Sequence, residues 1–474
     1  MLFPTIDFAI FFAVAFTANW LLNPYPRIWK LAMIAASYLF YSWWDWRFIF
    51  LLAASTALSH LGASALARLP DGRGRRAVLA GSVAALLGLL AWFKYYGFLS
   101  VNVDNALHAL HMGRAFPLLA VTLPVGVSFF TFMALSYVID VYRRVLEPAR
   151  PIDLAVYLSF FPHLVAGPIV RGGELLPQIR RRRDAKGIDF GRAAWLVAGG
   201  LFKKVVISSY VDAAIVRPVF GAPHQHSAIE ILFAAYGFAV EIYADFSGYT
   251  DIAIGIAMLL GFQFPANFDR PYTARNLQDF WRRWHMTLSR WLRDYVYIPL
   301  GGGRGSRWTT ARNVMITMVL GGLWHGAAWT FIAWGALHGF GQVVGHFRRD
   351  RRQRAGLDPV PEGTVRAVVQ RVATFHVVCL GWIFFRADSI SGAFTLIKRL
   401  FTAWGTAPLV TPLLLITVCG ALALQYLPAD AAQRAQRAFV RQGWAVQGAI
   451  LGVALLVITT LGPQGVAPFI YYRF

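Results

Sequence analysis

Residues 314–345 read VMITMVLGGLWHGAAWTFIAWGALHGFGQVVG and contain no Asp, Glu, Lys or Arg. An uncharged apolar run of this length is typical of a membrane-embedded segment. The run nevertheless carries His325, between Trp324 and Gly326, and a second histidine, His338. Burial keeps an imidazole neutral and able to accept a proton, and ionisable residues at membrane depth are candidates for function. A core histidine bonded to a neighbouring carbonyl is the alternative interpretation of His325.

The composition of the whole chain indicates a polytopic membrane protein. The chain has 474 residues, of which 57% are hydrophobic and 14% charged, which excludes a disordered chain and argues against an ordinary soluble globule. Its apolar runs are continuous, whereas a β-barrel would alternate in polarity. We predict an all-α membrane protein in which about 10 or 11 transmembrane helices, plus re-entrant or broken helices, surround a central tunnel. A single domain is predicted over residues 1–474.

The net charge of +22 comes from 45 basic and 23 acidic residues. Because the arginines cluster in short loops between apolar runs, they indicate cytoplasmic loops near anionic lipid or a phosphate-bearing substrate, and not a nucleic-acid-binding protein. Cys379 and Cys419 lie in apolar runs, so we expect buried thiols and neither a disulfide framework nor a metal site. No basic region precedes the first apolar run, so residues 5–22 are predicted to be a span and not a cleaved signal peptide.

Placing the arginine-rich loop 68–76 in the cytoplasm puts the N-terminus outside. The predicted spans are residues 5–22, 31–44, 48–66, 77–98, 116–139, 193–216, 229–262, 365–385, 409–427 and 444–461.

Two apolar segments interrupt the alternation of these spans. Residues 152–170 and residues 314–345 each have basic residues on both sides, and both flanks of each segment therefore prefer the cytoplasm. Each segment is predicted to enter the membrane and return, the second turning near residues 321–326 or 333–335. Prolines break helix geometry in the first segment, and the backbone groups freed there must bond to protein or to water in a cavity.

Residues 281–294, WRRWHMTLSRWLRD, are predicted to form one amphipathic helix at the cytoplasmic interface or dipping below it. His285 falls on its apolar face, and the arginines fall on the other face and its flank. A surface-anchoring helix with an incidental histidine is one interpretation. In the other, His285 points toward a site shared with His325, and the arginines attract the phosphates of a CoA or phosphopantetheine donor. The residues on the apolar face are Trp281, Trp284, His285, Leu288, Trp291 and Leu292.

Two carboxylates, Glu241 and Asp245, lie four residues apart inside the apolar run 229–262 and share a helix face. Carboxylates at this depth need partners, which we expect to be arginines of the basic segments. A structural role and a proton or ion pathway both fit this pattern. A proton- or ion-coupled transporter is therefore the rival to an enzyme.

Six motifs of this chain, taken together, are specific to one family. They are PVGVSFFTFMALSYVIDVYR (124–143), FFPHLVAGPIVR (160–171), YADFSGYTDIAIG (243–255), NFDRPY (267–272), FWRRWHMTLSRWLRDYVYIPLGG (280–302) and GGLWHG (321–326). With these motifs the chain resembles the membrane-bound O-acyltransferase (MBOAT) superfamily, and most closely its bacterial alginate-type O-acetyltransferase branch. The resemblance extends from the first span to GWIFFRAD at 381–388.

The resemblance implies an acyltransferase that acts on a hydroxyl, with His325 essential and His285 the second signature histidine. We expect His325 to act as general base. The expected donor is a cytoplasmic thioester such as acetyl-CoA, with no tightly bound cofactor and no metal. The residues expected to bind donor or substrate are Trp324, Arg282, Arg283, Arg293, Asn267, Ser247 and Asp245.

The acceptor implied by the resemblance is an exopolysaccharide or another cell-envelope glycan, O-acetylated outside a bacterial inner membrane. Lipid bilayer surrounds the chain, and a secreted or membrane-anchored, esterase-like protein is the expected partner that passes the acetyl group on. A lipid or a teichoic-acid-type acceptor, as in the related D-alanyl-transfer proteins, is the alternative within the same fold.

Overall fold

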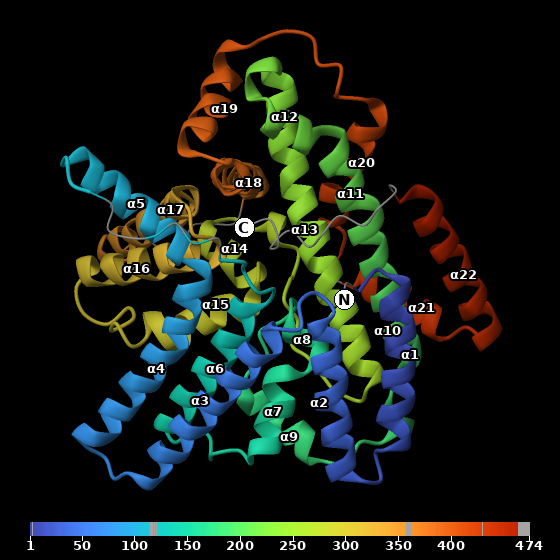
Figure 1. The fold of residues 1–474 in the computed structure, drawn as a ribbon. Helices are drawn as coiled ribbons and strands as arrows, with labels where there is room; N and C mark the ends of the chain where they lie inside the picture. The colour runs from blue at the N-terminus through green and yellow to red at the C-terminus, as the bar shows by residue number, and fades with distance from the viewer. Residues whose placement is uncertain are drawn as a thin grey trace. The chain divides into compact units, whose positions relative to one another are not determined.

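The computed structural model describes residues 1, 3–113, 117, 119, 121–356, 363–428 and 430–462, and every regular element within these ranges is a helix (Figure 1). The predicted all-α membrane class is confirmed. Eight described helical segments are apolar, and five of them are long enough to cross a membrane. The five are α3 (Phe48–Arg68), α4 (Arg73–Lys94), the run Phe190–Gly221, α18 (Thr364–Arg386) and α22 (Trp444–Leu461), and the shorter three are α1 (Ile6–Leu21), α6 (Val127–Tyr142) and α20 (Pro412–Leu424). The count of 10 or 11 spans and the central tunnel stay predictions.

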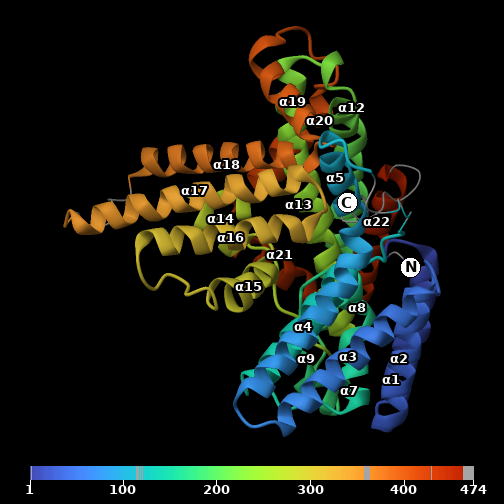
Figure 2. The same ribbon diagram turned by 60° about the vertical axis from the view of Figure 1, so that its left-hand side comes forward.

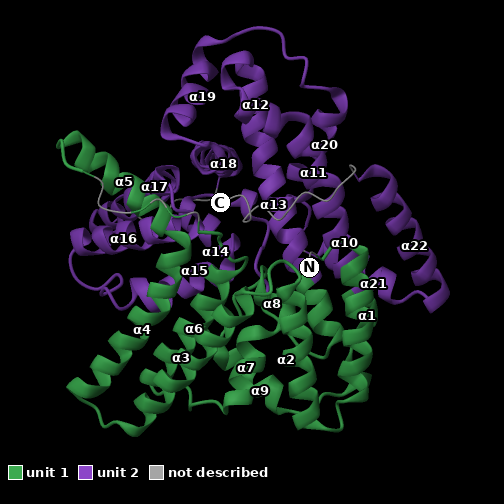
Figure 3. Cartoon of the chain, viewed as in Figure 1, with its two compact units in different colours: residues 1–193, 253–265 green, residues 194–252, 266–474 purple. Residues whose placement is uncertain are grey.

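The chain forms two compact units, residues 1–193 with 253–265 and residues 194–252 with 266–474 (Figure 3). A single domain over residues 1–474 stays a prediction. In the first unit α3 packs against α4, α6 and α7, and α2 packs against α1 and α7. The remaining helices of this unit are α2 (Pro26–Ser42), α5 (Tyr96–Ala109), α7 (Pro151–Ser159), α8 (Phe161–Leu164), α9 (Gly172–Arg180) and the 3-10 turn η1 (Ala185–Gly187).

The predicted break in residues 152–170 is confirmed. Helix α7 ends at Ser159, the short α8 follows, and the chain is not helical from there to Arg171. Protein groups satisfy backbone atoms freed by this break, because Phe161 N–H donates to Ser37 Oγ (3.2 Å) and Tyr157 Oη–H donates to the Val170 carbonyl (3.1 Å). The segment is therefore a buried, hydrogen-bonded part of the first unit.

One predicted span, residues 116–139, begins too early. Phe116 lies outside the described residues, but residues 121–126 are not helical and α6 starts only at Val127. Pro124 and the left-handed Gly126 (φ +76°) explain the late start, since both disfavour a continuous helix.

The second unit holds the stretch 314–345 as a helical hairpin, α16 (Arg307–His325) and α17 (Trp329–Arg354). The predicted turn of the chain is confirmed, since residues 326–328 adjoin the first of the two predicted positions, whereas entry of this hairpin into the membrane stays a prediction. Glycines let the two helices touch: a Cβ on Gly322 would lie 2.2 Å from the Phe331 carbonyl oxygen, and one on Gly335 would lie 2.5 Å from the Met318 carbonyl oxygen. Figure 2 shows α16, α17 and α18 side by side.

The run Phe190–Gly221 is helical throughout, with two π-helical stretches inside it. Its parts are α10 (Phe190–Leu201), η2 (Phe202–Ser208), α11 (Ser209–Val211), η3 (Asp212–Val216) and α12 (Arg217–Gly221). The second unit is completed by η4 (Pro223–Gln225), most of α13 (Ala228–Leu259), η5 (Pro271–Thr273), α14 (Leu277–Arg283), α15 (Met286–Leu292), η6 (Arg293–Tyr297), α19 (Ile390–Thr402) and α21 (Ala431–Val440).

Of the two cysteines, Cys379 is buried as predicted, whereas the prediction of a buried Cys419 is wrong. Cys419 lies on the outward face of α20, since that helix turns only Leu414 and Val418 inward.

Candidate active site

His285 lies at a break between two short helices. The prediction of one helix over residues 281–294 is wrong, because α14 ends at Arg283, Trp284 is extended, and His285 adopts the left-handed conformation (φ +41°) before α15 begins. That conformation costs a residue other than glycine roughly 1–2 kcal/mol. The predicted apolar face is nevertheless correct: Trp281, Trp284, His285, Leu288, Trp291 and Leu292 are all buried.

Asn267 holds the break in place. Its backbone carbonyl accepts a hydrogen bond from Met286 N–H (2.9 Å), and its side-chain Oδ1 accepts from the backbone N–H (3.1 Å) and hydroxyl (2.9 Å) of Thr287. A backbone N–H can only donate, so the orientation of the Asn267 amide is determined by its partners. These bonds offset the strain at His285.

The same Oδ1 decides the tautomer of His285. His285 Nδ1 lies 3.2 Å from Asn267 Oδ1, an atom that can only accept, so Nδ1 carries the proton. In a neutral imidazole Nε2 then has a free lone pair. Nε2 of His285 is buried and has no hydrogen-bond partner among the residues that the structure describes. His285 therefore offers a buried proton acceptor, and Asn267 holds this histidine, while the binding of substrate by Asn267 stays a prediction.

His325 is the last residue of α16 and is only 3% exposed. Its ring centroid lies 5.0 Å from that of Trp334 and 5.2 Å from that of Phe385. Trp324 contacts both histidines, with ring centroids 5.9 Å from His285 and 5.1 Å from His325. The second unit thus brings together two imidazoles that are 40 positions apart in the chain.

The other histidine of the hairpin, His338, is a packed core residue. It is fully buried on α17, and Trp281 Nε1–H donates to its Nδ1 (3.3 Å). The alternative interpretation of His325, a core histidine bonded to a carbonyl, stays open.

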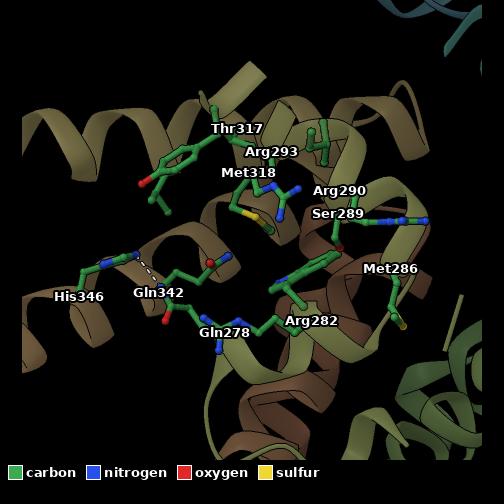
Figure 4. A pocket seen from close by; sticks show the side chains of 14 residues that line it. Gln278, Arg282, Met286, Ser289, Arg290, Arg293, Thr317, Met318, Gln342 and His346 are labelled. Atoms are coloured by element: carbon green, nitrogen blue, oxygen red, sulfur yellow. Dashed lines mark hydrogen bonds between the residues drawn. The ribbon is translucent and has the colours of Figure 1, made fainter. Parts of the chain in front are cut away.

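A cavity of about 520 Å³ opens beside the two histidines, between α14, α15, η6, α16 and α17. Figure 4 shows Gln278, Arg282, Met318 and Gln342 around it. Neither His285 nor His325 lines this cavity. Two lining residues connect it to them, because Met286 follows His285 directly and the Trp281 ring lies 5.6 Å from that of Trp334, which contacts His325. Trp281 and Trp334 therefore lie in series between the cavity and His325, whereas His285 is the chain neighbour of a lining residue.

A second cavity, of about 550 Å³, shares Gln278, Arg282 and His346 with the first. Further cations line it, namely Arg307, Arg349 and Arg354. Burial, together with the nearby Arg282, lowers the pKa of Arg349, and burial with the neighbouring Arg349 lowers the pKa of His346. Burial is the larger cause, and repulsion between Arg282, Arg349 and His346, which lie where the two cavities adjoin, is the smaller one. An anion bound there would relieve that repulsion.

Of the arginines predicted to bind the donor, Arg282 and Arg293 line the first cavity, with Arg290 beside them. Arg283 does not lie with them. Its guanidinium pairs with Asp279 (2.8 Å) and Asp269 (3.6 Å) beside a different cavity.

Two other predicted binding residues, Asp245 and Ser247, contact lysines on the run Phe190–Gly221. Asp245 pairs with Lys204, and Ser247 Oγ accepts a hydrogen bond from Lys203 Nζ (3.2 Å). The expectation of an arginine partner is therefore wrong for Asp245. Sequence reasoning missed both lysines, although their position inside an apolar run was the signal that could have found them.

Comparisons with known proteins agree with the motifs. The model of the membrane-bound O-acyltransferase family (MBOAT) matches residues 38–360. The probable alginate O-acetylase AlgI of Azotobacter vinelandii is 36% identical over 408 residues, which cover 85% of this chain and 78% of that protein. The peptidoglycan O-acetyltransferase of Helicobacter pylori is 34% identical (83% and 78% covered). The teichoic acid D-alanyltransferase of Streptococcus thermophilus is 29% identical (55% and 67% covered).

Proposed function

This chain belongs to the membrane-bound O-acyltransferase family, and on that premise we propose that it transfers acetyl from an acyl-CoA-type thioester toward the hydroxyls of a cell-envelope glycan. The observation that carries the donor assignment is the pair of adjoining cavities in the second unit. The surface of the first cavity is mostly apolar but includes Arg282, Arg290 and Arg293, and the second cavity adds Arg307, Arg349 and Arg354 beside Asp350. A CoA thioester has the same division, with a slender pantetheine arm and an acyl group at one end and phosphates at the other.

The arginines select the anionic end of the donor. Arg282 lines both cavities, so it lies where the phosphate-bearing part of the donor would join its pantetheine arm. Guanidinium groups bind phosphate oxygens in pairs of charge-assisted hydrogen bonds. Trp334 lies between Trp281 and His325, and Met286 follows His285 in the chain, so the thioester would reach the side chains of Trp281 and Met286 before either histidine. A shift of these two side chains is needed to admit the acyl group.

The reaction needs a base and a route for one proton. The acceptor oxygen attacks the thioester carbonyl, His325 removes the hydroxyl proton, the carbon–sulfur bond breaks, and the proton passes to the leaving thiolate. His285 offers Nε2 as a second acceptor, so we assign it to positioning the acceptor hydroxyl or relaying its proton. The products are an acetyl ester and a free thiol.

The proposed acceptor is supported by the relatives, whose names give alginate and peptidoglycan as O-acetylated polymers. We propose a multi-pass inner-membrane protein whose N-terminus lies outside, taking its donor from the cytoplasm. An exported, esterase-like partner then carries the acetyl group to the polymer. Reporter fusions to the loop 68–76 and to the N-terminus test this orientation, since a cytoplasmic N-terminus would reverse it.

The test of the function is purified protein in detergent with acetyl-CoA labelled in the acetyl group, with and without oligosaccharide acceptors. Release of free CoA together with a labelled O-acetyl ester supports the proposal. Transfer from a D-alanyl carrier thioester but not from acetyl-CoA would favour the teichoic-acid-type alternative. Ion flux in reconstituted vesicles without any acyl transfer would favour the transporter.

A further inference from the structure

A third cavity of the second unit, of about 410 Å³, lies on the other side of α14 from the proposed donor cavities. On a helix of 100° per residue, Gln278, Trp281 and Arg282 share one face of α14, whereas Asp279 and Arg283 point to another. The first three line the donor cavity and the last two line the third cavity. The short helix α14 therefore separates two basic sites.

Four guanidinium groups line the third cavity, those of Arg270, Arg275, Arg283 and Arg371. Two carboxylates form ion pairs with these arginines. Asp269 pairs with Arg270 (3.2 Å) and Arg283, and Asp279 pairs with Arg283 (2.8 Å). These four arginines and two carboxylates together carry a net charge of +2. Arg371 donates from Nε to the Thr273 carbonyl (3.3 Å) and pairs with no carboxylate among the described residues.

Two of these arginines, Arg270 and Arg275, lie on a loop that hydrogen bonds tie to neighbouring segments, whereas Arg283 lies on α14 and Arg371 on α18. Tyr272 N–H donates to Gln425 Oε1 (3.1 Å), and Tyr272 Oη–H donates to the Ala239 carbonyl on α13 (2.6 Å). Tyr426 Oη–H donates to the Tyr272 carbonyl (3.0 Å). The backbone of Arg270 is left-handed (φ +45°), a strained conformation that persists where the surroundings determine it. The cationic groups are therefore gathered before any ligand arrives, which lowers the entropic cost of binding one.

We propose that this cavity is a binding site for a phosphate ester, separate from the donor site. The excess of two positive charges matches a phosphate dianion, and several guanidiniums converging from separate segments suit its oxygens. Tyr426, which is 51% exposed, supplies an aromatic wall beside Arg371, whose guanidinium lies 5.9 Å from the ring centroid. A lipid headgroup and a soluble phosphate ester share this chemistry.

The test measures binding, so it does not depend on acyl transfer. Purified protein is titrated with dioctanoyl phosphatidic acid or with glycerol 3-phosphate, and thermal unfolding and native mass spectrometry report binding. Potassium chloride at equal ionic strength is the screening control. Arg371→Gln removes one guanidinium of the cavity, and Arg366→Gln, an exposed residue of the same helix α18, is the matched control.

We expect saturable binding of at least one phosphate probe, weakened about tenfold or more in Arg371→Gln and unchanged in Arg366→Gln. Response to the lipid probe alone identifies a membrane lipid as the source, and response to both probes identifies a soluble ester. The proposal is overturned if the wild-type protein binds neither probe, or if both variants respond alike. A raised KM for the thioester donor in Arg371→Gln would assign this cavity to the donor and also overturn it.

Discussion

Asn267 Oδ1 lies 3.2 Å from His285 Nδ1 and also accepts the backbone N–H of Thr287, so one amide oxygen fixes both the position and the tautomer of the imidazole. His285 sits in a strained left-handed conformation and cannot be held by its own helix. Asn267, 18 positions earlier in the chain, therefore holds His285 in a conformation that residues 281–294 do not maintain alone.

Replacing Asn267 tests this relationship. In Asn267→Leu the His285 N–H is buried without a partner, and we expect turnover to fall about 10- to 100-fold. In Asn267→Asp a carboxylate stabilises the imidazolium and raises the pKa of His285, so the neutral form appears only at higher pH. The acidic limb of the rate–pH profile should then move to higher pH. A variant that unfolds at the wild-type temperature, yet keeps the wild-type rate and profile, would show that Asn267 does not position His285.

The hairpin that carries His325 depends on close contact between α16 and α17. Gly335→Ala places a Cβ 2.5 Å from the Met318 carbonyl oxygen, and we expect a loss of about 1–3 kcal/mol from overpacking. Gly345→Ala on the same helix meets no atom within 4 Å and should be neutral or gain up to about 1 kcal/mol from helix propensity. Thermal unfolding in detergent compares the two, and equal unfolding temperatures would argue against tight packing at Gly335.

The buried pair Lys204–Asp245 should stabilise the second unit. Both side chains are at most 4% exposed, so Lys204→Met removes the cation that pairs with a buried carboxylate and should cost about 3–5 kcal/mol. Lys204→Met with Asp245→Leu removes both charges and should recover most of that loss. Lys203→Met is the control, because Lys203 and Asp251 are 25% and 29% exposed and their pair should contribute about 1 kcal/mol or less. A double variant no more stable than the single one would contradict this account.

The donor cavity predicts a contrast between adjacent arginines. Arg282→Gln should raise the KM for acetyl-CoA about tenfold or more, because a charge-assisted contact to phosphate is lost, with a smaller change in kcat. Arg283→Gln should leave that KM unchanged, because Arg283 lines another cavity. Steady-state kinetics at constant ionic strength measures both values. Equal effects of the two substitutions would remove the donor assignment.

Much of the fold could be predicted from hydrophobic runs and basic loops, because lipid favours apolar residues and headgroups favour basic ones at any position in the chain. The broken segment 152–170 and the return of the hairpin followed from charge on both flanks of an apolar run. The break at His285 could not be predicted, because its cause lies outside the local pattern. Periodicity shows only that a residue is apolar-facing, and residues 281–294 have the same buried face whether or not the helix is broken.

The partners of the buried carboxylates were harder to predict for a related reason. Arginine clusters dominate the charge pattern, but they lie in loops. The partner of Asp245 is Lys204, which lies inside an apolar run on a different helix. Likewise Arg282 and Arg283 are adjacent in sequence, and only the faces of α14 assign them to different cavities. The direction in which the side chains of a seven-residue helix point depends on where that helix ends. The sequence does not determine this boundary.

The most direct test of the central claim is acetyl release and transfer by a His325→Ala variant, with labelled acetyl-CoA and purified protein. Because general-base action contributes about 10²- to 10⁴-fold, the variant should lose at least 99% of the wild-type rate while unfolding at a similar temperature. A well-folded His325→Ala protein that turns over at the wild-type rate would contradict the account.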